Sequence, residues 1–81
     1  MIATDQNNAT LNIGDSVTYI QKDNKNTVIK GNIANIVTMA IVGGYRHKVD
    51  IKFNGGVGFK TIRVWADEVV KDEEKQVARN G

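Results

Sequence analysis

The chain contains no cysteine and no proline, and it has only one serine and one histidine. Without cysteine, neither a disulfide bond nor a thiolate metal site can stabilise the fold. At 81 residues, the chain is near the size at which a single hydrophobic core becomes marginal. We therefore expect one domain held together by packing alone, and a reducing, cytoplasmic setting fits this composition.

The same scarcity argues against an enzyme. Ser16 is the only serine and His47 the only histidine, and the sequence has no Asp-x-x-His pair to serve a serine nucleophile at "GDSV", residues 14–17. One histidine without cysteine does not complete a zinc site. The carboxylates of Asp67 and Glu68 are adjacent, and Asp67 is better explained as the cap of a helical turn than as half of a catalytic pair. We expect no catalytic residue, no metal and no cofactor.

Long apolar runs are also missing. The longest uncharged apolar stretch, residues 36–45, is far shorter than the ~20 residues that cross a bilayer. Residues 1–10 have neither a basic region nor an apolar core, so they do not resemble a secretory signal. We expect no membrane partner, and a flexible N-terminal segment over residues 1–10.

The charge is small but unevenly distributed. The net charge is +2, and residues 11–70 carry eight lysines and arginines against five acidic residues. A mildly basic centre permits an anionic partner. Residues 71–81 are balanced in charge and are expected to form a charged tail or a frayed helix. Nine asparagines and no proline are typical of an AT-rich genome, such as that of a phage.

Alternation of apolar and polar residues predicts five short strands. The clearest examples are Val49, Ile51 and Phe53 in one stretch, and Ile62 and Val64 in another. A change of phase between residues 31 and 35 predicts a bulge or a bend. The stretch "WADEVV", residues 65–70, resembles a helical turn that leads into a last short strand.

The glycines of "FNGGVGFKTIRVW", residues 53–65, are followed by a strand pattern, whereas a phosphate-binding loop needs a helix there. Asn54-Gly55 predicts a hairpin, which Gly56 and Gly58 can widen. For residues 36–51 we expect a second hairpin, in which Gly43-Gly44 form the turn and Val42 pairs with Tyr45. Its outward face then carries an apolar strip flanked by cations.

The order "IGDSV", "KGNIANI", "VDIKF" and "IRVWADEVV" resembles an SH3-like β-barrel, most closely its KOW-like branch. The resemblance covers residues 11–70 and implies an all-β, five-stranded barrel of the kind that serves as a binding module. The proline-peptide groove of adaptor SH3 domains is not matched, because the loop "QKDNKN", residues 21–26, has no aromatic residue.

Two binding functions follow as expectations. The first is contact with nucleic acid or a nucleoprotein complex through cations interleaved with an aromatic residue: Lys48, Lys52, Phe59, Lys60 and Arg63. Trp65 is expected to fill the core rather than to join them. The alternative is a protein-interaction module, such as a phage-encoded modulator of a host protein or a homodimer. It would use Val37, Met39, Ile41, Tyr45 and Arg46.

Overall fold

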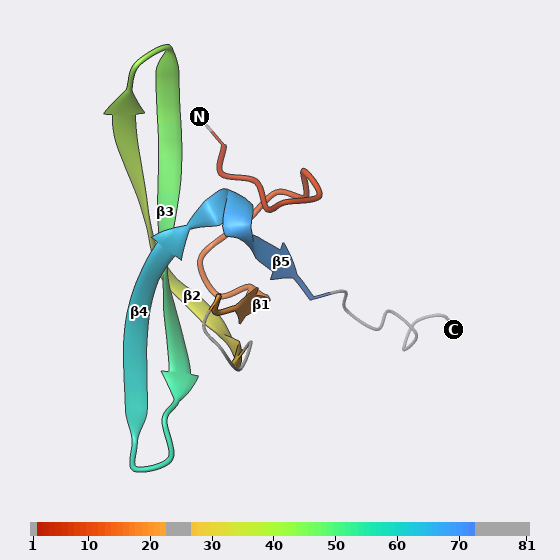
Figure 1. Cartoon of the computed structure of the whole chain (residues 1–81), viewed down its shortest axis with the longest axis vertical. Coiled ribbons are helices and arrows are strands. Elements are labelled where there is room, and N and C mark those ends of the chain that lie inside the picture. Colours follow the sequence, from red (N-terminus) through yellow and green to blue (C-terminus); the bar gives the residue numbers. More distant parts are fainter. Residues whose placement is uncertain (1, 23–26, 73–81) are drawn as a thin grey trace, which may run out of the picture.

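The computed structural model describes residues 2–22 and 27–72, which form one five-stranded antiparallel sheet (Figure 1). The strand order is β4-β3-β2-β1-β5. The prediction of an all-β fold with five strands and a helical turn is therefore confirmed. Of the tail expected over residues 71–81, Lys71 is the last residue of the final strand, and 73–81 lie outside the described residues. The elements are β1 (Ser16–Ile20), β2 (Val28–Ile41), β3 (Gly44–Asn54), β4 (Phe59–Trp65), the 3₁₀ turn η1 (Ala66–Glu68) and β5 (Val69–Lys71).

The long strand β2 changes partner at a bulge. Its first half pairs with β1 up to Asn32, and its second half pairs with β3, with a register shift between Ile33 and Asn35. This confirms the predicted break in phase. Bulges bend a strand and increase its twist, so β2 can belong to both sides of the fold. Gly31 lies just before the bulge, where a Cβ atom would collide with the Lys52 carbonyl oxygen.

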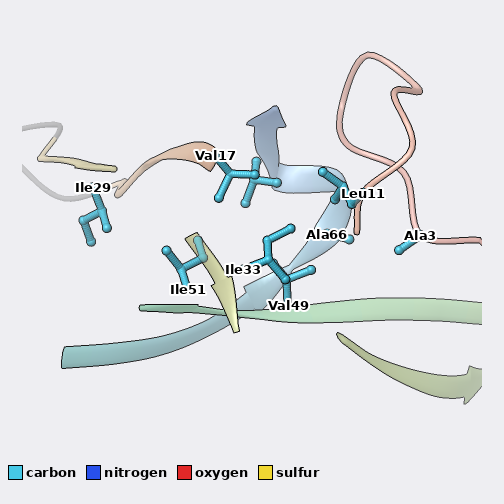
Figure 2. Close-up of a cluster of buried hydrophobic side chains, with 9 residues drawn as sticks. Ala3, Leu11, Val17, Ile29, Ile33, Val49, Ile51 and Ala66 are labelled. Carbon is cyan, nitrogen blue, oxygen red and sulfur yellow. The ribbon is translucent and has the colours of Figure 1, made fainter. Parts of the chain in front are cut away.

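The bend in β2 folds the sheet into two parts, one with β1 and β5 and the other with β3 and β4, and the core lies between these parts. Figure 2 shows Val17 from β1 facing Ile33 from β2 and Val49 and Ile51 from β3. These four side chains are almost completely buried, as is Val69 from β5. They are β-branched residues, which suit both strands and close packing. The full set of buried apolar residues is Ala3, Leu11, Val17, Ile29, Ile33, Val49, Ile51, Ala66 and Val69.

The N-terminal segment is part of this core, in contrast to the expectation of a separate flexible segment over residues 1–10. Ala3 and Leu11 are buried, and the Leu11 N–H donates to the Ala3 carbonyl at 2.9 Å. Between them the chain makes a loop that is closed by a bridge from Thr4 to Thr10. The buried apolar residues Ala3 and Leu11 anchor the loop at its two ends, although most of the residues between them are polar.

The turn between β2 and β3 differs from the predicted one. Ile41 pairs with Gly44, so Val42 and Gly43 form the turn, and the prediction that Gly43-Gly44 form it is wrong. Gly43 has a φ of +91°, which glycine adopts without strain. The true register is offset by two residues from the predicted one. An offset of two preserves which side chains share a face, because the side-chain period of a strand is two.

The hairpin between β3 and β4 is confirmed, and its loop is wider than a two-residue Asn54-Gly55 turn. Asn54 pairs with Phe59, and residues 55–58 form the loop. The Gly55 N–H donates to the Gly58 carbonyl at 2.7 Å, and the Asn54 side chain accepts from the Gly56 N–H at 2.9 Å. The two hairpins extend from opposite ends of β3 (Figure 1).

Candidate functional site

One face of β3 and β4 points away from the core. Val49 and Ile51 are buried, so the residues that alternate with them in β3 and their partners in β4 lie on the opposite side. The register places Lys48 opposite Trp65 and Asp50 opposite Arg63. We call this surface the outer face; it consists of Arg46, Lys48, Asp50, Lys52, Phe59, Thr61, Arg63 and Trp65.

Trp65 lies on the outer face and is not part of the buried core, so the expectation that it fills the core is wrong. The Arg46 guanidinium carbon is 3.9 Å from the centroid of the Trp65 ring, and the Lys48 Nζ is 4.6 Å from it. Both distances are within the range of cation–π attraction. The indole is thus half-buried by cations from β3, and not by apolar side chains of the core.

Phe59 repeats this arrangement at the other end of β4. Its side chain is 69% exposed, and the Lys52 Nζ lies 5.0 Å from its ring centroid. Within residues 2–22 and 27–72, neither Lys48 nor Lys52 forms an ion pair with a carboxylate. Each of these two lysines therefore has an aromatic ring, and no carboxylate of the described residues, as the partner of its ammonium group.

The two arginines of the outer face are engaged differently. Arg63 donates two hydrogen bonds to the Asp50 carboxylate, at 2.6 and 3.1 Å, and Arg46 donates two to Asp67, at 3.1 and 3.0 Å. The hydrogen bonds from Arg63 hold the pKa of Asp50 below its ordinary value, although burial opposes the shift. The hydrogen bonds that Arg46 donates to Asp67 raise the pKa of Arg46.

Asp67 was expected to cap the helical turn, but its side chain forms no cap. Trp65 occupies the N-cap position of η1 without a side-chain hydrogen bond. Asp67 lies within the turn and binds Arg46. The carboxylate instead fixes the guanidinium over the Trp65 ring.

The charge of the outer face accounts for the net charge of the chain. It carries four cations, and the carboxylates of Asp50 and Asp67 are paired with two of them, which leaves an excess of two positive charges. The other seven cations and seven carboxylates of the sequence cancel, giving the net charge of +2. The excess positive charge is therefore concentrated beside the two aromatic rings.

The structure brings together four of the five residues predicted to bind nucleic acid. Lys48, Lys52, Phe59 and Arg63 share the outer face. Lys60 does not, because it pairs with Phe53 on the other side of the sheet and its stem lies against Gly55. Sequence reasoning missed Trp65, although it has the same strand parity as Phe59 and Arg63. Its size had favoured the core.

The residues predicted to form a protein interface lie on the hairpin of β2 and β3. Val37, Met39 and Ile41 are on the same side as Arg46, whereas Tyr45 is on the side of His47. Met39 is 39% exposed and Ile41 45% exposed. At the turn, Val42 is fully exposed. The apolar strip is thus accessible over the outer half of this hairpin.

The other surface features of the described residues are less suited to binding an anionic partner or a metal. A hollow of about 470 Å³ over β1 and β5 is lined by Asp67 and Glu68 and by a single cation, Lys22. Among the residues that the structure describes, no three acidic, histidine or cysteine side chains gather to hold a metal. In that same part of the chain, no helix is both long enough and apolar enough for a bilayer.

Comparison of the chain with models of protein families, with curated protein sequences and with solved structures finds no significant match.

Proposed function

We propose that this protein is a non-enzymatic, cytoplasmic binding module of the SH3-like, KOW-like kind that contacts nucleic acid through its outer face. The strand order supports the architecture, with β1 between β5 and β2, and so does the 3₁₀ turn before β5. The bulge that divides β2 between two partners supports it too. The residues of the outer face support the proposed function.

One observation carries the proposal: the outer face holds two aromatic rings, each beside a lysine that has no ion pair with any carboxylate in the described part of the chain. Lys48 lies against Trp65 and Lys52 against Phe59. Nucleic-acid-binding proteins combine cations for the phosphates with aromatic faces on which bases stack. A base that stacks on Phe59 would displace the Lys52 ammonium from the ring, and the ammonium would then be free to meet a phosphate.

The spacing of the rings favours a single strand. Phe59 and Trp65 are six residues apart in β4, which is about 20 Å along an extended strand. An extended nucleotide chain spans such a distance with a few nucleotides, whereas bases stacked inside a duplex expose no face to an aromatic ring. Arg63, between the two rings, is already bound to Asp50 and contributes less to phosphate binding.

The test measures binding of fluorescent single- and double-stranded DNA and RNA oligonucleotides at several salt concentrations. We expect tighter binding to single strands, with affinity falling as salt rises. Stacking on the only tryptophan of the chain should also quench its emission. Lys52→Gln should reduce the slope of log affinity against log salt by about one. Absence of salt-dependent binding to all four oligonucleotide types would contradict the proposal.

Matched variants separate the outer face from general basicity. Lys22→Gln removes the same charge from an exposed position away from the outer face and should leave affinity nearly unchanged. Lys60→Gln tests the one predicted residue that lies on the other side of β4, and we expect a smaller loss than for Lys52→Gln. Equal losses in all three variants would show non-specific attraction.

The second candidate function is a protein-interaction module, such as a phage-encoded modulator of a host protein, and the exposed strip of Met39 and Ile41 favours it. An affinity pull-down from a cell lysate, with and without nuclease, distinguishes the two. Capture that survives nuclease and is lost in Met39→Asp/Ile41→Asp supports this second function. Capture that nuclease removes supports the first.

A further inference from the structure

The two outermost strands of the sheet, β5 and β4, are protected from pairing with another chain. The edge of β5 is covered by the N-terminal loop, because the Gln6 N–H donates to the Val69 carbonyl at 3.1 Å and the Asp5 carboxylate accepts from the Lys71 N–H at 2.7 Å. The edge strand β4 carries Lys60 and Arg63. Covering loops and charged side chains are the usual means by which proteins prevent strands from pairing edge to edge.

The second half of β2 has neither protection. From Asn35 to Ile41 it pairs with β3 on one side, while pairing with β1 ends at Asn32 and the Asp15 backbone reaches only as far as Ile33. Across the described residues, no backbone hydrogen bond reaches 35–41 from outside the hairpin. Residues 31–45 also contain no charged residue and no proline. This is a seven-residue strand edge with its hydrogen-bonding groups open.

We propose that this edge of β2 pairs with the same edge of a second copy of the chain, in antiparallel orientation, to form a two-fold symmetric dimer. The edge is complementary to itself, because it has no charge that would face a like charge in the second copy. The open backbone donors and acceptors of one copy meet those of the other, as in strand addition to a sheet. A closed two-fold contact also leaves no further edge for a third copy.

The symmetry restricts the register. Side chains that face each other across the pair must lie on the same side of the sheet, so the two opposing residue numbers must sum to an even number. The midpoint of Asn35–Ile41 is Thr38, and centring the axis there pairs all seven residues. Thr38 then opposes its own copy. On the outer side Val37 opposes Met39 of the second copy.

Pairing also supplies what the hairpin lacks. The outer part of the hairpin extends beyond the core (Figure 1), and the strands on both sides of its turn have only each other as partners there. A two-stranded ribbon is marginally stable in water, whereas three or more strands with an apolar face are stable. Two hairpins joined along β2 form a four-stranded sheet and bring Val37 and Met39 of each copy into contact.

The test uses opposite charges at the facing positions. We expect the unmodified chain, of 8.9 kDa, to sediment at twice that mass at high concentration and to dissociate on dilution. Val37→Lys/Met39→Lys and Val37→Glu/Met39→Glu each place like charges across the axis, and each should raise the dimer dissociation constant about 100-fold. An equimolar mixture should restore a mixed dimer, because every Lys then faces a Glu.

A matched control and a crosslink complete the test. Ile20→Lys/Val57→Lys adds the same charge at exposed apolar positions away from this edge and should leave dimerisation unchanged. Because the chain has no cysteine, Thr38→Cys introduces one thiol that faces its copy and should form a disulfide dimer on oxidation, whereas Val57→Cys should not. This crosslink reports on the pairing even if the charged variants fail to fold.

Three results would overturn the proposal. The first is a monomeric chain at every concentration. The second is a double-lysine variant that dimerises as tightly as the unmodified chain. The third is a dimer in which Thr38→Cys does not crosslink. None of these results depends on nucleic-acid binding, so this proposal and the proposed function can fail separately.

Discussion

The Asp5 carboxylate accepts a hydrogen bond of 2.7 Å from the backbone N–H of Lys71, which joins two residues 66 positions apart in the sequence. Its other oxygen accepts from the N–H groups of Asn7 and Ala9, both at 2.8 Å. Asp5 is only 3% exposed. A buried carboxylate is stable when backbone donors surround it. Here the Asn7 and Ala9 donors close the N-terminal loop on itself, and the Lys71 donor links that loop to β5.

We predict that Asp5→Ala lowers the free energy of unfolding by on the order of 3 kcal/mol, because three part-buried backbone N–H groups lose a charged acceptor. Asp5→Asn should be less destabilising, since the amide oxygen can still serve Asn7 and Ala9 while its NH₂ group faces the Lys71 N–H. Urea unfolding measures both changes. Asp15→Asn is the control, because the Asp15 carboxylate accepts from the Asn12 N–H at a more exposed turn. If Asp15→Asn loses as much stability as Asp5→Ala does, the special role of Asp5 is contradicted.

Stability should decline at acid pH partly through the same residue. Burial by itself raises the pKa of the Asp5 carboxyl, but hydrogen bonds from the Lys71, Ala9 and Asn7 backbones outweigh burial and set the pKa below its ordinary 3.8. A lowered folded-state pKa gives stability that is present above the unfolded-state value and lost as pH falls through the folded-state value. The urea concentration at the midpoint of unfolding should therefore decrease once the pH is lowered below about 4.

Asp50 contributes to this acid loss in the same direction, since Arg63 lowers its pKa. Each single variant, Asp5→Asn or Asp50→Asn, should therefore remove only part of the loss of stability that the unmodified chain shows at acid pH. The contribution of Asp50 should be the smaller of the two, because its partner Arg63 is half exposed to solvent. If Asp5→Asn loses as much stability at acid pH as the unmodified chain does, Asp5 does not contribute to that loss.

Gly31→Ala should destabilise the fold by at least about 2 kcal/mol, because the new methyl group collides with backbone atoms that cannot move independently. The Cβ would lie 2.9 Å from the Ile51 Cγ2 and against the Lys52 carbonyl. Gly55→Ala is the matched control, because there the nearest atoms belong to the flexible Lys60 side chain. Thermal unfolding of both variants tests this, and equal losses would contradict the argument.

Trp65 should report the positive potential of the outer face. Because Arg46 and Lys48 lie against its ring, iodide should quench its fluorescence more strongly than caesium does. The difference should shrink at high salt and in Lys48→Gln, but not in Lys22→Gln. If caesium quenches as well as iodide, the cations do not dominate the surroundings of the indole.

Local patterns predicted the strands because apolar alternation is a property of neighbouring residues. Val49 and Ile51 are buried as their alternation with Lys48 and Lys52 requires. Face assignments in the hairpin of β2 and β3 were correct despite the wrong turn, since an offset of two does not move a side chain to the other side. The turn itself was mistaken because Val42-Gly43 and Gly43-Gly44 both contain a glycine able to adopt positive φ.

The candidate site was predicted only in part. Lys48, Lys52, Phe59 and Arg63 could be grouped because strand parity places them together once the hairpin is known. Arg63 pairs with Asp50 and Arg46 with Asp67, so among the described residues Lys48 and Lys52 are the cations of the outer face without a carboxylate partner. No sequence pattern distinguishes these two lysines from the arginines. Trp65 was misplaced because its bulk was weighed above its parity.

The sequence alone determined the all-β class, the position of the strands, the bulge and the two hairpins, because strand alternation and turn chemistry act between residues close along the chain. Only the tertiary structure decided that Asp5 reaches Lys71, that Arg46 and Lys48 cover Trp65, and that residues 35–41 have an open edge. These relationships depend on the path of the whole chain. Many pairings are compatible with one local pattern, and packing around a single core selects among them.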